Sequence, residues 1–388
     1  MKKKNIIIMY IITFLQGMVF YASIATLYRT SNGITLLEMG IIESICSILI
    51  IILEIPWGII CDKIGYKKTL IVCNFVYFIS KIVFYNACSF NTFLLERFMM
   101  AFVVAGLSGC DTALLYESTT EEESTKVFGY YRTLGTLGMI LASCMFSLFI
   151  KNDISKTALW TIYTYGIAFI FTFFLEDVST KKKESTQLSL SEFPKYLNNL
   201  KRVILFVLVA GLLTETTHTL NTFYNQLQYE RASIPVEYFG FLYVLITLCS
   251  LSSASIGKLT KRFKEEKIIL YLLIFSLFSC LLLRFTINPI FSVICIGLLT
   301  VIEALFFPMM DTIFNRHVSI NRATTLSIYS MILNMIGVGT NIIFGRSADR
   351  GIVSALNVGC IFISIALIVY IIWLTHVEKI SKINNRNE

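Results

Sequence analysis

Residues 41–68 read IIESICSILIIILEIPWGIICDKIGYKK, an apolar run that ends in a short basic loop. The run belongs to a span expected over 38–60, long enough in a helix rising about 1.5 Å per residue to cross about 30 Å of hydrocarbon. The lysines at positions 63, 67 and 68 are typical of a loop held in the cytosol. Because backbone polar groups in lipid must be satisfied internally, a run of this kind is a transmembrane helix.

The whole chain repeats this arrangement. Of its 388 residues 56% are apolar and only 15% are charged, whereas a soluble domain carries close to a quarter charged residues. The apolar runs predict an all-α integral membrane protein with twelve transmembrane helices, the first of them an uncleaved N-terminal span. The expected spans are 6–28, 38–60, 69–90, 93–116, 127–150, 157–175, 203–226, 237–257, 268–287, 289–313, 324–344 and 353–375.

The chain consists of two similar halves. Short matching segments recur in the same order and at the same place in each half, at an offset of about 200 residues, as expected for a duplicated six-helix unit. The matches are Gly40 with Gly240, Gly58 with Gly257, and Asp111-Thr112 with Asp311-Thr312. We therefore expect an N-terminal six-helix bundle over 1–178, a cytoplasmic linker over 179–202, and a pseudo-symmetric C-terminal six-helix bundle with a short cytoplasmic tail over 203–388.

The distribution of charge predicts the orientation in the membrane. The net charge is +8, and most Lys and Arg residues fall in the segments that share a side with the N-terminus, a strong bias under the positive-inside rule. Both termini are therefore expected in the cytoplasm and the protein in the plasma membrane, with no role in nucleic-acid binding. The ten cysteines form no Cys-x-x-Cys pair and mostly lie in apolar spans, so neither a metal site nor a cofactor is expected.

One loop carries the most specific family signal. Positions 58 to 68 read Gly-x-x-x-Asp-Lys-x-Gly-x-Lys-Lys, which resembles the loop signature of the major facilitator superfamily. The resemblance implies two six-helix halves that work as a monomer by alternating access, with this loop as a conformational latch. The matching residues are Gly58, Asp62, Lys63, Gly65, Lys67 and Lys68. Independently of the family, a glycine at position 65 permits a tight chain reversal.

The fourth span ends in a polar stretch with an acidic residue. Residues 108–117 read SGCDTALLYE, which resembles the fourth span of bacterial drug-efflux-type facilitators, in which an acidic residue follows small residues. A charge within lipid is costly, so Asp111 is a functional candidate. Two roles stay open for it: coupling of proton and solute movement, or a structural ion pair with Arg132 in the fifth span.

Further polar residues within spans are candidates for proton coupling or the substrate cavity. Helical spacing places four residues of the polar seventh span, Glu215, His218, Thr222 and Asn225, on roughly one face. This face either lines a cavity or contacts a neighbouring helix. A carboxylate one turn from an imidazole exchanges protons near neutral pH. The candidates in the seventh span are Glu215, His218, Asn221, Thr222 and Asn225; the others are Glu303 and Asp311 in the tenth span and Glu43 in the second, with Lys81 as one partner considered for Glu43.

These features predict a secondary transporter and not an enzyme, because the three histidines lie far apart and no phosphate-binding loop occurs. The first reading is proton-coupled export of a small amphipathic or drug-like solute. The second is proton-coupled import of a small metabolite, and the third is a membrane sensor that transports nothing. The expected partners are the solute, protons and the lipid bilayer.

The direction of transport stays open at this point. Family antiporters often have a glycine four residues after an arginine in the fourth span, but here Ala101 follows Arg97. They also often carry a proline in the glycine-rich part of the fifth span, and the segment from Gly135 to Ser143 has none. The fourth-span stretch thus favours export, and the missing proline favours import.

Overall fold

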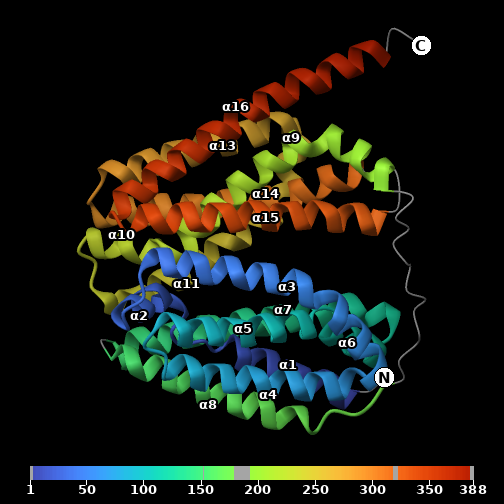
Figure 1. The fold of residues 1–388 in the computed structure, drawn as a ribbon, viewed down its shortest axis with the longest axis vertical. Helices are drawn as coiled ribbons and strands as arrows, with labels where there is room; N and C mark the ends of the chain where they lie inside the picture. Colours follow the sequence, from blue (N-terminus) through green and yellow to red (C-terminus); the bar gives the residue numbers. More distant parts are fainter. Residues whose placement is uncertain (1–2, 152, 179–192, 318–321, 385–388) are drawn as a thin grey trace. The chain divides into compact units, whose positions relative to one another are not determined.

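The computed structural model describes residues 3–151, 153–178, 193–317 and 322–384, and the regular elements in these ranges are all helical (Figure 1). Eleven helical stretches in them are long and apolar enough to cross a membrane. The predicted all-α membrane fold is therefore confirmed. The described chain divides into two compact units, one within Met1–Ser185 and Pro235–Val244, the other within Thr186–Ile234 and Leu245–Glu388.

The expected sixth span corresponds to α8 (Ile154–Thr172), which is not among the eleven. Its threonines, and Lys156 in its first turn, make it less apolar than the other spans. Within α8 the hydroxyls of Thr157, Thr161 and Thr172 donate to backbone carbonyls three or four residues earlier. These three hydroxyls are thus satisfied within the helix, which packs against α1 (Lys3–Gly17) and α4 (Tyr66–Tyr85). The Tyr165 hydroxyl donates across the contact with α1, to the Gln16 carbonyl.

The first unit is held together by contacts between helices that are distant in sequence. Apart from the three helices just named, its helices are α2 (Ala25–Ser31), α3 (Leu36–Ile64), α5 (Phe90–Leu107), α6 (Cys110–Ser118) and α7 (Glu121–Met145), which ends in a π-helical turn, Phe146–Ile150. Helix α5 packs against α3 and α4, and α1 packs against α7. Helix α3 begins at a capping box, in which Thr35 accepts from the Glu38 N–H and Glu38 accepts in return.

The loop singled out in the sequence is a one-residue reversal. Helix α3 ends at Ile64 and α4 begins at Tyr66, with Gly65 between them at φ +86°. This backbone conformation strains residues that carry a Cβ. The predicted role of Gly65 in a tight reversal is therefore confirmed.

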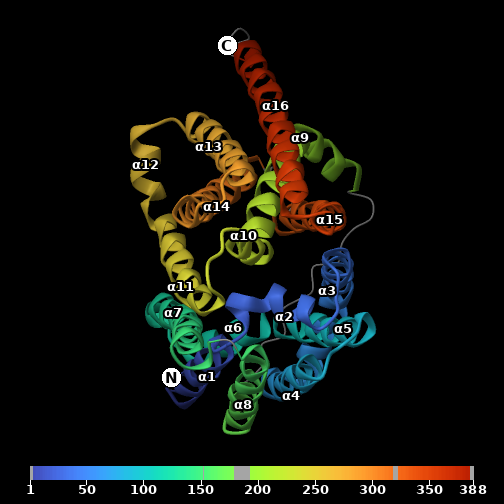
Figure 2. The same cartoon turned by 90° about the vertical axis from the view of Figure 1, so that its left-hand side faces the viewer.

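The second unit is built around α9 (Phe193–His218), whose described apolar part is the most buried of the eleven candidate spans. Helix α9 packs against α14 (Pro289–His317), α15 (Arg322–Ala348) and α16 (Ile352–Asn384), and Figure 2 shows α9 beside α16. Phe206 at its centre meets the rings of Phe306, Phe314 and Trp373 at 5.1 to 6.3 Å. The remaining helices of this unit are α10 (Asn225–Arg231), α12 (Ile256–Arg262) and α13 (Glu265–Phe285), with a short 3-10 turn at Leu251–Ser255. Helix α11 (Phe239–Ser250) is shared, because its residues up to Val244, and the 3-10 turn Val236–Tyr238 before it, belong to the first unit.

The glycines of the fifth span lie where α1 and α7 cross at very close range. A Cβ added at Gly138 would lie 2.2 Å from the Phe14 carbonyl oxygen, and one at Gly17 would lie 2.1 Å from the Gly135 carbonyl oxygen. Small residues at such crossings let two backbones approach in a membrane. These glycines therefore set the distance between the two helices.

Candidate functional site

Several expected spans are interrupted, and candidate residues lie at three of the interruptions or beside them. The first span breaks between α1 and α2, the fourth breaks at Ser108 and Gly109, and the seventh passes from α9 through a π-helical turn, Thr219–Phe223, into α10. The sequence predicted unbroken helices over 6–28, 93–116 and 203–226. Irregular backbone at membrane depth is tolerated where it is buried in protein or lines a cavity, and broken helices mark binding sites in transporters.

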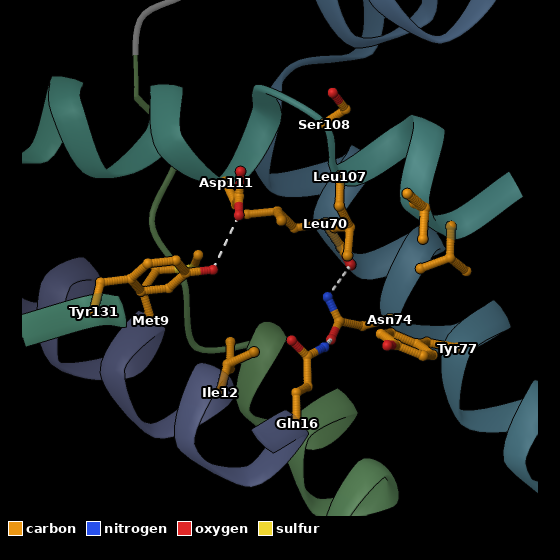
Figure 3. Close-up of a pocket in the computed structure, with 12 residues that line it drawn as sticks. Met9, Ile12, Gln16, Leu70, Asn74, Tyr77, Leu107, Ser108, Asp111 and Tyr131 are labelled. Carbon is orange, nitrogen blue, oxygen red and sulfur yellow. Dashed lines mark hydrogen bonds between the residues drawn. The ribbon is translucent and has the colours of Figure 1, made fainter. Parts of the chain in front are cut away.

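The first unit contains a cavity of about 400 Å³ beside the break in the fourth span (Figure 3). It lies between α1, α4, α5, α6 and α7, and part of its wall is apolar. Its polar lining consists of Gln16, Asn74, Tyr77, Ser108, Asp111 and Tyr131. A few polar groups in a largely apolar wall are the usual composition of a small-molecule site.

Asp111 faces this cavity from the first turn of α6 (Figure 3). Its Oδ2 accepts a hydrogen bond of 3.0 Å from the Tyr131 hydroxyl, and its Oδ1 accepts one of 2.6 Å from the Thr112 N–H. The carboxylate is half-buried, and the positive end of the α6 dipole favours its charge. The ion pair considered with Arg132 is not formed in the described chain, since Arg132 is exposed and the hydroxyl of Tyr131 contacts Asp111 instead.

Two side-chain amides form the opposite polar wall. Gln16 Nε2 donates to Asn74 Oδ1 at 2.6 Å, and Asn74 Nδ2 donates to the Leu70 carbonyl at 2.8 Å. Gln16 lies one residue before α1 ends, so the break in the first span borders the same cavity as the break in the fourth. The cavity thus offers a carboxylate at one side and an amide pair at another, which suits a solute with hydrogen-bonding groups.

A second cluster lies in the second unit, at the π-helical turn. His218 Nδ1 lies 3.6 Å from Glu303 Oε1, and Asn221 Nδ2 donates to Glu303 Oε2 at 3.1 Å. The Thr222 hydroxyl lies 3.4 Å from the His218 ring nitrogen. Four residues predicted from the sequence therefore meet here, and Glu303 is brought by α14, not by the seventh span itself.

Of the other candidates of the second half, Glu215 lies near this cluster and interacts electrostatically with His218 and Glu303. The carboxylate of Glu215 packs against Gly337 of α15, about 3.0 Å from where a Cβ would stand, so the carboxylate at ion-pair distance from His218 is that of Glu303. The side-chain oxygen of Asn225 accepts from the neighbouring backbone N–H, and Asp311 is exposed on α14. Helical spacing placed Asn225 on the face of His218 because it assumed a continuous helix through the π-helical turn.

Glu43 pairs with arginines and not with Lys81. Its Oε1 lies 2.7 Å from Arg97 Nη2 and 3.8 Å from Arg29 Nη1, while Lys81 lies near Glu96. The sequence named Glu43 and Lys81 as charges within spans, but it did not reveal this larger cluster.

The structure describes most, but not all, of the predicted latch residues. The side chain of Asp62 lies outside the described part of the chain, and Lys63 and Lys68 are exposed while Lys67 is half-exposed. A Cβ at Gly58 would meet no described atom within 4 Å. The close helix contact that would explain this glycine is therefore absent from the described chain.

Of the six polar residues that line the cavity, sequence reasoning named only Asp111 as a candidate. Gln16, Asn74 and Tyr131 were not among the candidates, yet they supply much of its polar surface. Gln16 and Asn74 are polar residues within apolar spans, the signal that identified Asp111, so the same criterion applied to uncharged side chains would have found them. Tyr131 carries no such signal, because tyrosine is common at membrane interfaces.

The helical architecture, the broken spans and the polar interior define a membrane transporter. A sequence model of the Major Facilitator Superfamily matches residues 6–335. The chain belongs to this superfamily, and the resemblance drawn from the loop signature is confirmed at that level.

Similar proteins support the same assignment. An uncharacterized MFS-type transporter of Methanocaldococcus jannaschii is 30% identical over 139 residues, 34% of this chain and 36% of the relative, so the match spans little more than a third of that relative's length. Among solved structures, the nucleoside transporter NupG is 18% identical with a TM-score of 0.81, covering 96% of this chain and 99% of that one. A D-xylose–proton symporter is 11% identical with a TM-score of 0.69, covering 95% and 97%. At these identities the likeness shows the fold alone.

Proposed function

We propose that the protein is a secondary transporter that exports a small amphipathic or drug-like solute across the plasma membrane in exchange for protons. Alternating access of the two halves around their polar interior moves the solute. The observation that carries this proposal is the position of Asp111, a half-buried carboxylate that lines a 400 Å³ cavity together with two side-chain amides.

Asp111 couples the two movements by serving both as proton acceptor and as solute contact. A proton and a solute that compete for one carboxylate are coupled thermodynamically, because binding of either weakens binding of the other. The Tyr131 hydroxyl, at 3.0 Å, orients the carboxylate toward the cavity. This arrangement supports exchange, in which the solute leaves as the proton enters.

The cluster of His218, Glu303 and Asn221 is the second proton-handling centre of the proposal. Histidine changes charge in the physiological pH range, and Glu303 lies 3.6 Å from its ring nitrogen. The side chain of His218 is 53% exposed, so the imidazole reaches solvent or solute directly. Both centres lie at helix interruptions, where transporters bind ions and substrates.

Proton-coupled import is the second candidate. The fifth span of this chain is a regular helix from Glu121 to Met145 without the proline that family antiporters often carry. In addition, one structural neighbour is described as a D-xylose–proton symporter. Import and export use the same residues and differ in whether solute and proton move together or in opposite directions.

Three further properties belong to the proposal. Both termini lie in the cytoplasm, as the Lys and Arg bias favours, and the protein acts as a monomer of two six-helix bundles joined by the 179–202 linker. The loop with Gly65, whose reversal is formed, acts as the conformational latch. The drug-efflux-like branch of the family rests on the 108–117 stretch.

Proton movement in proteoliposomes tests the proposal. A pH-sensitive dye is trapped inside, solutes from a panel of amphipathic cations, nucleosides, sugars and short peptides are added outside, and the luminal pH is followed. Exchange makes the lumen more alkaline and co-transport makes it more acidic, whichever way the protein is inserted. Asp111→Asn is the test variant. Glu117→Gln is the matched control, because Glu117 is an exposed carboxylate on the same short helix.

Alkalinisation by a panel solute with the wild type and Glu117→Gln, but not with Asp111→Asn, is the result expected for export. Acidification with the same dependence on Asp111 favours import. Equal proton movement in all three proteins would refute the role of Asp111 and direct the test to His218 and Glu303. If no solute moves protons in the wild type, proton-coupled transport of these solute classes is refuted.

A further inference from the structure

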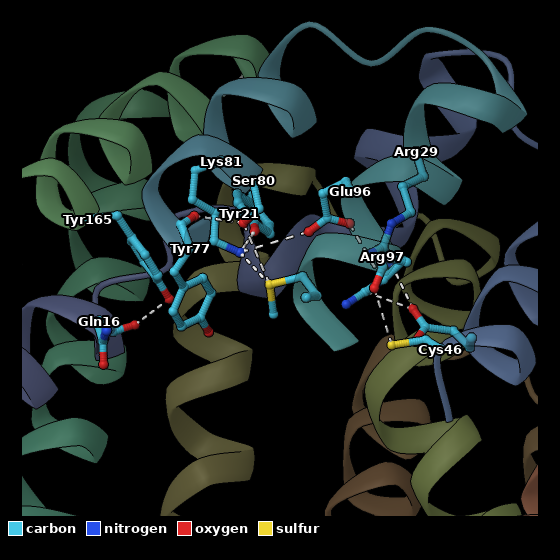
Figure 4. A network of polar contacts seen from close by, with 12 residues as sticks. Gln16, Tyr21, Arg29, Cys46, Tyr77, Ser80, Lys81, Glu96, Arg97 and Tyr165 are labelled. Carbon is cyan, nitrogen blue, oxygen red and sulfur yellow. Dashed lines mark hydrogen bonds and ion pairs between the residues drawn. The ribbon is translucent and has the colours of Figure 1, made fainter. Parts of the chain in front are cut away.

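Five charged side chains from four helices meet inside the first unit (Figure 4). We call them the charge cluster: Arg29 on α2, Glu43 on α3, Lys81 on α4, and Glu96 and Arg97 on α5. Arg29, Lys81 and Glu96 are 6%, 3% and 1% exposed. Charges this deeply buried in a membrane protein are costly and point to function.

With all five side chains ionised, the cluster carries a net charge of +1. Three cations share two carboxylates, and no other charged side chain of the described residues joins them. Apart from the Glu96 carboxylate at 3.9 Å, the groups around Lys81 are neutral: its ammonium donates to the Tyr21 hydroxyl at 3.1 Å and lies 4.8 and 5.0 Å from the ring centres of Tyr77 and Tyr165. A buried charge without a counter-ion is strongly unfavourable, so the excess calls for an anion.

The cluster is also short of hydrogen bonds. The contact from Arg29 to Glu43 is 3.8 Å and that from Lys81 to Glu96 is 3.9 Å, both too long for a hydrogen bond. Glu96 Oε2 and Arg97 Nε are buried and face each other at 3.6 Å without a hydrogen-bond partner. The Arg29 guanidinium packs over the ring of Phe84, 5.7 Å from its centre. Arg97 Nε is therefore a buried donor without an acceptor, and the Arg29 guanidinium lies too far from Glu43 to donate to it.

The cluster opens on one side. The side chains of Arg97 and Glu43 are 18% and 19% exposed, several times more than those of Arg29, Lys81 and Glu96, and they are joined by the shortest ion pair of the cluster, 2.7 Å. A ligand that arrives from this side meets Arg97 first and finds its guanidinium occupied by Glu43.

We propose that the charge cluster is a binding site for a carboxylate group of the transported solute, with Arg97 and Arg29 as the residues that recognise it. A single negative charge balances the excess of one, whereas a phosphate dianion would reverse it. The planar guanidinium matches the two oxygens of a carboxylate. Glu43 holds Arg97 when no solute is bound and is displaced by it. That the carboxylate is carried by a transported solute rests on the proposed function; the existence of the site does not.

A purely structural ion network and an anion-binding site predict different stabilities, and the Arg29→Gln variant distinguishes them. If the cluster only joins helices, Arg29→Gln removes a stabilising contact and the protein becomes less stable. If the cluster awaits an anion, Arg29→Gln leaves two cations with two carboxylates, so the protein without ligand is as stable as the wild type or more stable. Removing Arg97 instead leaves Glu43 without its closest partner, so Arg97→Gln is expected to be less stable in either case.

The test is thermal unfolding of the purified full-length protein with and without benzoate. Benzoate is compared with benzamide, its neutral counterpart, and with sodium chloride at equal ionic strength, over about 1 to 50 mM, the range expected for so small a ligand. At ten times its dissociation constant, benzoate should raise the unfolding temperature of the wild type by roughly 2 to 4 °C. Arg29→Gln should weaken the apparent affinity for benzoate by about tenfold or more.

Lys4→Gln is the matched control, because Lys4 forms an exposed ion pair with Glu176 outside the cluster. It should keep the full effect of benzoate. The inference is overturned if benzamide stabilises as well as benzoate, if Arg29→Gln responds like the wild type, if it is destabilised without ligand, or if benzoate has no effect on the wild type. Stabilisation by inorganic phosphate or by phosphatidylglycerol nanodiscs, but not by benzoate, would also overturn it and assign the site to free phosphate or to a lipid headgroup.

The carboxylate site and the proposed function can be refuted independently of each other. If benzoate binds through Arg29 while no panel solute moves protons, the carboxylate site stands and the proposed function fails. If cationic or neutral solutes move protons in an Asp111-dependent manner while benzoate does not bind, the proposed function stands and the carboxylate site fails.

Discussion

The crossing of α1 and α7 makes a sharp prediction for Gly138→Ala. A Cβ at this position would lie 2.2 Å from the Phe14 carbonyl oxygen, whereas ordinary contacts begin near 3.4 Å. Because the obstacle is backbone, no rotation of a side chain relieves it, and the helices must separate by about 1.2 Å. The cavity is affected as well, since α1 carries Gln16 and α7 carries Tyr131 into its wall.

The size of the effect follows from two opposing terms. Overpacking of a close contact costs roughly 1 to 3 kcal/mol, while replacing glycine by alanine within a helix stabilises by about 0.5 to 1 kcal/mol. Gly129→Ala isolates the second term, because Gly129 lies on the same helix with no described atom within 4 Å of its missing Cβ. Because the second term is common to both variants, Gly138→Ala should be less stable than Gly129→Ala by the overpacking term alone, roughly 1 to 3 kcal/mol.

Thermal unfolding of the two purified variants measures this difference, which corresponds to roughly 2 to 12 °C for a unit of this size. The proteoliposome assay should show normal proton movement for Gly129→Ala and a reduced rate for Gly138→Ala, because separation of the helices lengthens the 3.0 Å contact between Tyr131 and Asp111. If both variants unfold at the same temperature and transport equally, α1 and α7 do not cross at this distance and the reasoning is refuted.

Three further predictions concern single side chains. Tyr131→Phe removes the hydrogen-bond donor to Asp111. Because a hydrogen bond to a charged group contributes about 1.5 to 3 kcal/mol, this variant should lower the apparent solute affinity about tenfold or more. The concentration dependence of proton movement measures this affinity. Glu303→Gln keeps an oxygen for the neighbouring amide but removes the charge facing His218, so the transport rate should depend less on pH between about 6 and 7.5; an unchanged pH profile would contradict this. Asp153 caps α8, and its pKa is lowered by hydrogen bonds and charge from the following turn, so it stabilises above its unfolded pKa of about 4 and loses this contribution as the pH falls through its folded value. Asp153→Asn should therefore be less stable than the wild type at neutral pH and equally stable in acid, by unfolding at both pH values.

The membrane fold and the family could be predicted from the sequence because each depends on the properties of single residues or on a short motif. Span length and apolar content predict helices in lipid wherever they occur. The Gly65 reversal was readable for the same reason, since only glycine adopts its φ of +86° without strain. Asp111, His218 and Glu303 could be named as candidates because a charge within a span is unusual anywhere.

Which of these residues meet was decided by the tertiary structure. The π-helical turn after His218 rotates the following residues, so Asn225 leaves the face on which a continuous helix would place it. The break at Gly109 turns Asp111 toward Tyr131 and not toward Arg132. No local pattern announces such breaks, because a glycine in a membrane helix more often packs than interrupts.

The sequence by itself thus predicted the lipid environment of this protein, its helical spans and a short set of charged candidates. Only the tertiary structure decided the cavity beside Asp111, the partner of His218 and the cluster of three cations with two carboxylates. The physical reason is the difference in range between the properties that decide each feature. Hydropathy is a property of single residues, whereas the contacts of Glu43 with Arg97 and Arg29 depend on how four helices break, rotate and cross, and these choices minimise the packing energy of the whole unit.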